Sequence, residues 1–210
     1  MAGAPPYRIE TERLLLRCWD PGDAELLGDA VAASIAELQP WMAWAHDEPL
    51  TLDGRIALLR EFRSKFDSDR EWIYGIFSSD GSSVLGGTGL HPDVGGDALE
   101  IGYWIRSNAT GAGLGGEAAA AMTRTGFRLH GVGRLEIRVA PGNTRSARIP
   151  ERLGYTMEGR LRRLLPPAAP GGGREDALVY TMLAEEFDAS PAGAVPIRAF
   201  DAAGRPLDAG

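Results

Sequence analysis

The residues Leu99-Glu-Ile-Gly-Tyr-Trp-Ile105, followed by the turn Gly111-Ala-Gly-Leu-Gly-Gly116, set the fold that we expect for this chain. Apolar residues alternate along the first stretch, which is typical of a β-strand with one buried face. From Leu114 to Leu129 apolar residues recur at helical spacing, so the turn opens a helix. Glycines there let the backbone approach a ligand, and free N–H groups at a helix start can bind phosphate. The stretch predicts a strand, an anion-binding turn and a helix in succession.

The turn also satisfies the dinucleotide-binding pattern G-x-G-x-x-G, and Glu136 lies about 20 residues further on, where an acidic ribose ligand is expected. The preceding chain argues against this reading. Hairpin signals at Asp80-Gly81 and Gly95-Gly96 link successive strands, whereas the dinucleotide fold alternates strands and helices. Arginines flank Glu136 on a short strand, which indicates an outward-facing side chain. Nicotinamide binding is therefore the less favoured alternative.

Further helices and strands are predicted before and after the stretch 99–116. A crossover helix should lay the strand at 135–139 parallel to the strand at 99–105. Asp20-Pro21 is a helix-start signal, with Asp20 as the N-cap. Further strands are predicted at 9–18, 72–78, 84–90, 155–165 and 176–183, and further helices after residue 20 and at 52–66 and 143–152.

Length, charge and cysteine content limit the function classes. The chain of 210 residues suits one domain, which we place at 1–188, with an Ala-, Gly- and Pro-rich tail at 189–210 that is free to move. A net charge of −7 argues against nonspecific nucleic-acid binding. A single cysteine, Cys18, allows neither an internal disulfide nor a cysteine-based zinc cage. No long apolar run suggests a membrane span, and the segment 1–6 lacks a secretory signal, so we expect a cytoplasmic protein.

Five sequence blocks occur in a characteristic order: Glu10-Thr-Glu-Arg-Leu-Leu-Leu-Arg17, the strand at 99–105, the turn at 111–117, Asn143-Thr-Arg-Ser-Ala-Arg-Ile-Pro-Glu-Arg-Leu-Gly-Tyr155 and Met157-Glu-Gly-Arg-Leu-Arg162. Together they resemble the GCN5-related N-acetyltransferase (GNAT) superfamily, and its ribosomal-protein N-terminal acetyltransferase (RimJ/RimL-like) branch most closely. The resemblance covers roughly residues 8–188. It implies an α/β fold with a central mixed, mostly antiparallel sheet, one parallel pair of splayed strands and flanking helices.

The resemblance implies acetyl-CoA as co-substrate and no metal. The family turn usually begins with Gln or Arg and has a basic residue between its first two glycines, but this chain has Thr110 and Ala112. Arg106 or Arg148 can compensate for these missing side chains. The implied contacts are the pantetheine arm with Ile105, Arg106, Ser107 and Asn143, the pyrophosphate with Thr110, Gly111, Ala112, Gly113, Leu114, Gly115 and Gly116, and the sulfur with Ser146.

Catalytic candidates follow from the chemistry of acyl transfer. Glu100 shares a strand face with Gly102 and is the first candidate for general base; His91 is the second. Ser146, which matches the family hydroxyl near the sulfur, is the candidate that hydrogen-bonds or protonates the departing thiolate. Many family members have a tyrosine as general acid where this chain has Pro150. A backbone N–H near Ile105 would stabilise the oxyanion. The non-catalytic alternatives are that Glu100 is a solvated strand glutamate and that Ser146 only satisfies backbone groups at the start of a helix.

On the acceptor side, Trp41 and Trp44 lie in the family's substrate loop, where they would form the acceptor site together with Glu100; core packing is the alternative for each tryptophan. We expect His46 and His130 at the surface. An α-amino group has a pKa of about 8 and needs less help from a base than lysine.

The expected function is transfer of an acetyl group from acetyl-CoA to a primary amine, for instance a protein N-terminal α-amine, by direct attack in a ternary complex. The alternatives are a small-molecule amine as acceptor, a larger acyl-CoA as donor, or a non-catalytic acyl-CoA sensor. The expected partner is the amine acceptor, without direct nucleic-acid or membrane contact, and a homodimer is allowed for.

Overall fold

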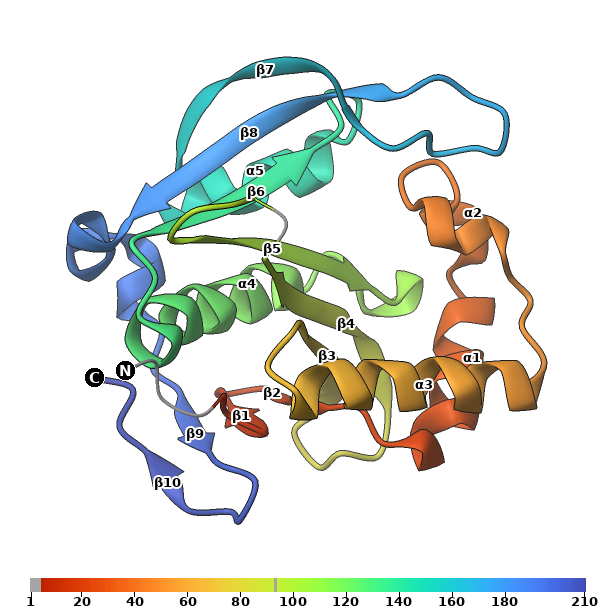
Figure 1. Cartoon of the computed structure of the whole chain (residues 1–210), viewed down its shortest axis with the longest axis horizontal. Helices are drawn as coiled ribbons and strands as arrows, with labels where there is room; N and C mark the ends of the chain where they lie inside the picture. The colour runs from red at the N-terminus through yellow and green to blue at the C-terminus, as the bar shows by residue number, and fades with distance from the viewer. Residues whose placement is uncertain (1–4, 93) are drawn as a thin grey trace.

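The computed structural model describes residues 5–92 and 94–210, so residues 1–4 of the N-terminal segment considered above lie outside the described residues. Its strands form one sheet in the order β10-β9-β1-β2-β3-β4-β5-β6-β8-β7 (Figure 1). The strands are β1 (Arg8–Glu10), β2 (Leu14–Cys18), β3 (Trp72–Ser78), β4 (Val84–His91), β5 (Ala98–Ile105), β6 (Arg134–Val139), β7 (Thr156–Leu165), β8 (Glu175–Leu183), β9 (Arg198–Phe200) and β10 (Pro206–Leu207).

The predicted fold class is confirmed. Among the described strands, β5 and β6 form the parallel pair, and the other neighbours are antiparallel. The parallel pairing is short, joining residues 98–100 to 134–136, whereas the rest of β6 pairs only with β8. Beyond Glu100 the two strands therefore separate and leave a gap in the sheet.

Local signals explain where the helices begin. Asp20 is the N-cap of η1, as predicted, and its carboxylate accepts a hydrogen bond from the Gly22 N–H at 2.9 Å. Thr51 caps α3 and Asn143 caps α5 in the same way.

The α-helices are α1 (Ala24–Ala32), α2 (Ile35–Leu38), α3 (Leu52–Asp67), α4 (Leu114–Arg124) and α5 (Thr144–Leu153). The 3-10 helices are η1 (Pro21–Asp23), η2 (Ala43–His46), η3 (Ser107–Ala109), η5 (Ala184–Ala189) and η6 (Pro191–Ala194), and η4 (Thr125–His130) is a π-helix.

Two apolar cores lie on the two faces of the sheet. On one face α4 buries Ala118–Met122 completely, because its small alanines let the helix approach the strands closely. Figure 1 shows α1 and α3 on the other face, where Trp19 and Phe77 belong to their apolar cluster. Full burial of a side chain such as Leu59 contributes about 1.5–3 kcal/mol. None of the helices in the described part of the chain is long and apolar enough to span a membrane.

The first predicted strand, 9–18, was wrong as one element. It is a hairpin of β1 and β2, in which Thr11 accepts a hydrogen bond from the Leu14 N–H at 3.0 Å. The segment 189–210, expected to be a tail, contains η6 and the strands β9 and β10. β9 pairs with β1 and so extends the sheet at the end opposite β7 (Figure 1).

Candidate functional site

Two cavities meet where β5 and β6 separate. The larger, which we call the turn groove, has a volume of about 580 Å³ and lies between the glycine turn, the end of β5 and α5. The smaller, the strand cavity, has a volume of about 270 Å³ and lies between η2, β5, β6 and the loop joining β7 to β8. Both cavities are lined by Trp41, Met42, Tyr103, Asn143 and Ser146. Two molecules bound in these cavities would meet at this shared boundary.

The glycine turn presents backbone to the turn groove. Gly111 and Gly113 have φ angles of 83° and 81°, in the left-handed region that favours glycine. Nothing lies within 4 Å of where a Cβ would stand at Gly111 or Gly116. The first helical hydrogen bond of α4 is donated by the Glu117 N–H, so the preceding N–H groups have no partner within the helix. This arrangement fits a diphosphate.

Salt bridges and hydrogen bonds hold this turn in place. Arg13 on the β1–β2 turn donates to the Ala112 carbonyl at 2.8 Å and to the Glu117 carboxylate at 2.7 Å. Thr110 donates its hydroxyl to the Ser107 carbonyl at 2.8 Å. Thr110 lines the turn groove, whereas Ala112 faces Arg13 and is absent from its lining.

The residues after β5 are only partly free for a ligand. Ile105 and Ser107 line the turn groove, and Arg106 does not. The Arg106 N–H donates to the Leu85 carbonyl at 2.7 Å, and the Ser107 N–H donates to the Ser34 hydroxyl at 3.0 Å. These two amides are therefore already satisfied within the fold, and of the three residues Ile105 is the one best placed to pair with a ligand.

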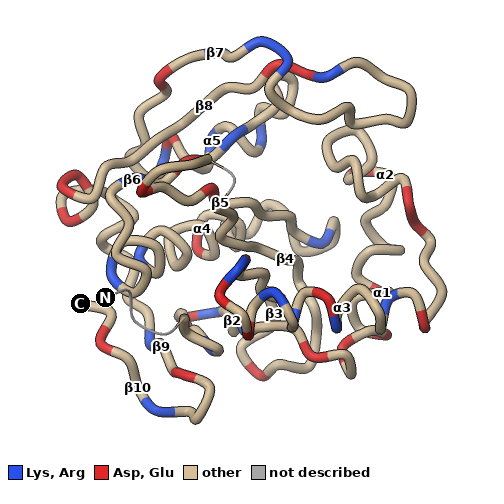
Figure 2. The backbone as a smooth tube through the Cα atoms, in the orientation of Figure 1, with Lys and Arg blue, Asp and Glu red and all other residues tan. Residues whose placement is uncertain are grey.

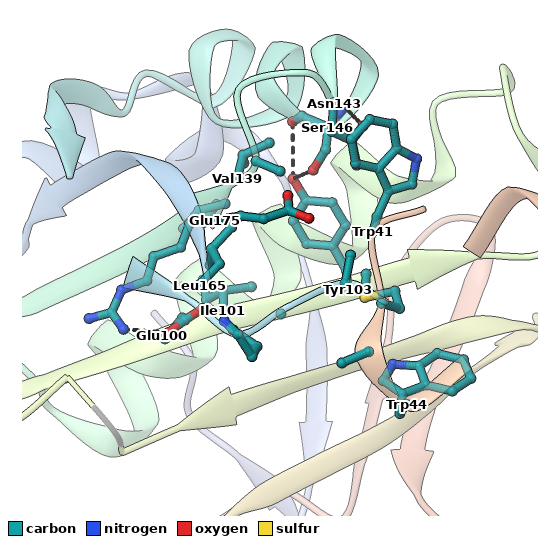
Figure 3. A pocket seen from close by; sticks show the side chains of 18 residues that line it. Trp41, Trp44, Glu100, Ile101, Tyr103, Val139, Asn143, Ser146, Leu165 and Glu175 are labelled. Carbon is teal, nitrogen blue, oxygen red and sulfur yellow. Dashed lines mark hydrogen bonds and ion pairs between the residues drawn. The ribbon is translucent and has the colours of Figure 1, made fainter. Parts of the chain in front are cut away.

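Ser146 faces the boundary between the cavities. Its Oγ donates to the Tyr103 hydroxyl at 3.2 Å, and that hydroxyl donates to the Ser146 carbonyl at 3.2 Å (Figure 3). The Asn143 side chain accepts from the Ser146 N–H at 3.1 Å, which fixes the start of α5. Burial raises the pKa of Tyr103 to about 12, so its hydroxyl stays protonated at neutral pH. Tyr103 was not predicted as a site residue, because its partner is on a helix distant in the chain.

Glu100 lines the strand cavity and belongs to a charged network on one sheet face. Arg138 contacts Glu100 at 3.2 Å and Glu136, its neighbour across the parallel pair, at 3.0 Å. Arg134 contacts Glu136 from the other side at 2.9 Å. Glu136, expected to face outward, is only 9% exposed because the two arginines cover it.

His91 lies directly across from Glu100 on the neighbouring strand. Its Nδ1 is 2.7 Å from the Glu71 carboxylate, and its ring lies over Gly89 and Gly102, which have no side chains to block it. The hydrogen bond to His91, aided by Lys65, lowers the pKa of Glu71 to about 2. His91 is thus oriented on the face that carries Glu100, although it is not among the residues lining the strand cavity.

The acceptor-side residues expected from sequence do meet in one place. Trp41 and Trp44 are 39% and 38% exposed, so they are not core residues, and both line the strand cavity together with Glu100 (Figure 3). Glu175 also lines this cavity. It was not predicted from the sequence, because its position depends on the path of the long loop between β7 and β8.

Three arginines on α5 line the turn groove: Arg145, Arg148 and Arg152. Only Arg148 was expected from the sequence. Their spacing of three and four residues places them on one helix face. Figure 2 shows blue segments, which mark Lys and Arg, along α5. Within the described residues none of the three has an acidic partner within ion-pair distance. In a chain of net charge −7, this face is a local concentration of free positive charge.

The two remaining histidines differ. His46 is partly buried, with Nε2 3.1 Å from the Gln39 carbonyl. His130 was wrongly expected at the surface: it is 9% exposed and packs edge-on against Trp72 at 4.2 Å. Burial lowers the pKa of His130 to about 4. Neither histidine lines the two cavities.

Comparison with known proteins places this arrangement among acetyltransferases. A family model described as an acetyltransferase (GNAT) domain matches residues 13–156. The chain is 28% identical to the putative ribosomal N-acetyltransferase YdaF of Bacillus subtilis, over 84% of this chain and 94% of that protein. It is 29% identical to the [ribosomal protein uS5]-alanine N-acetyltransferase of Escherichia coli, over 75% of this chain and 82% of the relative. Mycobacterium smegmatis RimJ, solved in complex with CoA-disulfide, superposes with a TM-score of 0.79 at 25% identity, covering 92% of this chain and 95% of RimJ.

Proposed function

Because the chain belongs to the GNAT acetyltransferase family and is an acyl-CoA-dependent N-acetyltransferase, we propose that its acceptor is the N-terminal α-amino group of a protein. The observation that carries this proposal is the meeting of the turn groove and the strand cavity at Tyr103 and Ser146. The donor would enter by the groove and the amine by the cavity. Relatives that are named for acetylating ribosomal proteins support a protein acceptor.

Acetyl-CoA supplies the acetyl group as a thioester. The amides of Leu114, Gly115 and Gly116 would bind its diphosphate, since the turn is open and these groups have no helical partner. The α5 arginines would provide the positive charge that Thr110 and Ala112 lack. Asn143 keeps its amide N–H₂ available for the pantetheine arm, because only its oxygen caps the helix.

Direct attack in a ternary complex agrees with the position of the cysteine. Cys18 lies on β2, is buried and lines neither cavity. Burial raises the pKa of its thiol to about 11, which opposes formation of a nucleophilic thiolate. The chain therefore has no suitable thiol from which to build an acyl-enzyme.

In our mechanism an unpaired N–H of β5 near Ile105 holds the developing oxyanion, because β5 has lost β6 as a neighbour there. Ser146 protonates the departing thiolate, and Tyr103 holds the serine hydroxyl in position. Glu100 and His91 are the two candidate bases expected from the sequence. Arg138 orients the first and Glu71 the second, so either would receive an amine proton only through water.

A panel of peptides tests the acceptor. One peptide carries a free N-terminal alanine and an internal lysine, and its twin carries the same lysine behind a blocked N-terminus. We expect CoA release and an N-terminal acetyl group, located by mass spectrometry, only with the first peptide. Acetylation of the lysine in both peptides would contradict the proposal. Binding of acetyl-CoA without CoA release, for any peptide or small amine, would instead indicate a sensor.

A further inference from the structure

The carboxylates around the strand cavity are not equivalent. Glu100 is bound by Arg138, and Glu136 lies under two arginines and does not line the cavity. Glu175 lines the cavity, and within the described part of the chain it has neither a cationic partner within ion-pair distance nor a side-chain hydrogen bond. It is thus the carboxylate with capacity left to bind a ligand.

Sheet geometry explains why Glu175 points inward. It is the first residue of β8 and pairs with Leu165 across the strands. Its neighbour Asp176 points to the other face, as alternation requires, and there contacts Arg160 at 2.9 Å and the Arg163 N–H at 3.0 Å. The two adjacent carboxylates therefore differ in role: Asp176 binds residues of β7 within the β7–β8 hairpin, and Glu175 faces the cavity.

The position of Glu175 relative to the cavity boundary is the second observation. Figure 3 shows its side chain extending into the cavity toward the end where Tyr103 and Ser146 lie, whereas Glu100 lies at a different end, beside its arginine. Trp41, which lines both cavities, belongs to the same end. An amine held here would have a carboxylate on one side and an aromatic face on another, and both attract a cation.

We propose, on the basis of the proposed function, that Glu175 is the catalytic residue that binds the acceptor's ammonium group and removes its proton. The carboxylate takes one proton from the ammonium, so that the nitrogen lone pair forms the C–N bond while the C–S bond breaks. Ser146 protonates the sulfur, and the second amine proton returns to Ser146 through water. Protons balance, because Glu175 leaves the cycle protonated and releases its proton to solvent.

The test compares Glu175→Gln with the matched variant Asp176→Asn, which removes the adjacent carboxylate on the outer face. With an N-terminal peptide acceptor at pH 7, we expect kcat/KM to fall about 100-fold in Glu175→Gln and to stay near wild type in Asp176→Asn. The dissociation constant of acetyl-CoA, measured by calorimetry, should be unchanged in both variants. That measurement also shows that each variant is folded.

The pH profile separates proton removal from a structural role. As pH rises from 7 to 9 the amine loses its proton to water, so the deficit of Glu175→Gln should shrink toward the wild-type rate. Added formate should partly rescue Glu175→Ala. A Glu175→Gln rate within twofold of wild type, or a deficit that is equal at pH 7 and pH 9 and not rescued by formate, would overturn the proposal. Failure of the wild-type protein to bind acetyl-CoA or acetylate any amine would contradict the proposed function instead.

Discussion

The phenol oxygen of Tyr103 on β5 lies 3.2 Å from the side-chain hydroxyl of Ser146 on α5, although 43 residues separate them in the chain. The contact spans the gap that β5 and β6 leave in the sheet, where the turn groove and the strand cavity join. Each hydroxyl restricts the other's orientation. Helix α5, which carries Pro150 within it, thus has a phenol from a different element next to its serine.

Removal of this phenol should slow the chemical step. For Tyr103→Phe we expect kcat to fall about 10-fold or more, because Ser146 loses the group that orients its hydroxyl, while KM for acetyl-CoA changes little. Steady-state kinetics with a peptide acceptor measure both constants. Tyr180→Phe is the control, because Tyr180 donates to Glu151 at 3.0 Å and lines neither cavity. Equal losses of kcat in the two variants would contradict a specific role for Tyr103.

The α5 arginines should determine donor affinity. A charge-assisted hydrogen bond contributes about 1.5–3 kcal/mol, so we expect Arg148→Ala and Arg152→Ala each to weaken acetyl-CoA binding roughly 10-fold. The control is Arg60→Ala, which removes an exposed arginine on α3 away from the turn groove. Calorimetry with acetyl-CoA and with its 3′-dephospho form identifies the phosphate: a residue that binds the 3′-phosphate loses its effect with the dephospho form. Unchanged affinity in both variants would rule the arginines out as phosphate ligands.

His130 should make the fold sensitive to mild acid. Its pKa is lowered by burial to about 4 in the folded protein, against about 6.5 when unfolded, so only the unfolded state gains a proton between these values. Stability is fully present above pH 6.5 and falls as pH decreases. We expect a loss of about 2 kcal/mol between pH 7 and pH 5, measured by urea unfolding. His130→Phe should show a flatter dependence; an identical slope would mean that another group is responsible.

The C-terminal segment should be needed for stability rather than for the site. The guanidinium of Arg124, 9% exposed, donates to the carbonyls of Gly193 and Gly210 at 2.6 Å and to those of Val195 and Ala209 at 3.2 Å. A chain ending at residue 188 would lose all four of these carbonyl partners and much of the packing around Arg124. We expect a loss of about 3 kcal/mol or more in unfolding free energy.

The same truncation has an internal control. Arg124→Met in the shortened chain removes the guanidinium that has lost its carbonyl partners, so it should recover part of the lost stability. In the full-length protein the same substitution should be destabilising. If residues 1–188 alone were as stable as the full chain, the domain boundary expected from sequence would hold and the packing of β9 on β1 would be dispensable.

Local signals in the sequence were sufficient for most of the fold. The N-cap Asp20, the glycine turn and the alternation along β5 each act over a few residues, and all three appear as predicted. β9 and β10 were missed because strands of three and two residues are too short to show a period. His130 was wrongly predicted to be exposed, because the side chain that packs on it, Trp72, is distant in the sequence.

The candidate site was predictable only where it is made of consecutive residues. The turn at 111–116 and the pair Asn143 and Ser146 could be selected from motifs, and both line the turn groove. Glu175 could not, because it follows a long loop and its inward direction depends on the register with Leu165. Arg138 was likewise hidden, since its two carboxylate partners lie on different strands.

The close approach of Gly115 to Ile149 shapes the turn groove at the end of β5. A Cβ at Gly115 would stand 3.1 Å from the Ile149 Cδ1 and 3.4 Å from the Ile105 Cγ1, so this glycine lets α4 and α5 close over the end of β5. Since β5 and β6 are paired only over residues 98–100 and 134–136, no residue of β6 pairs with β5 at this end. A single methyl group at position 115 would therefore reshape the turn groove from the helix side, at a place remote from the amine.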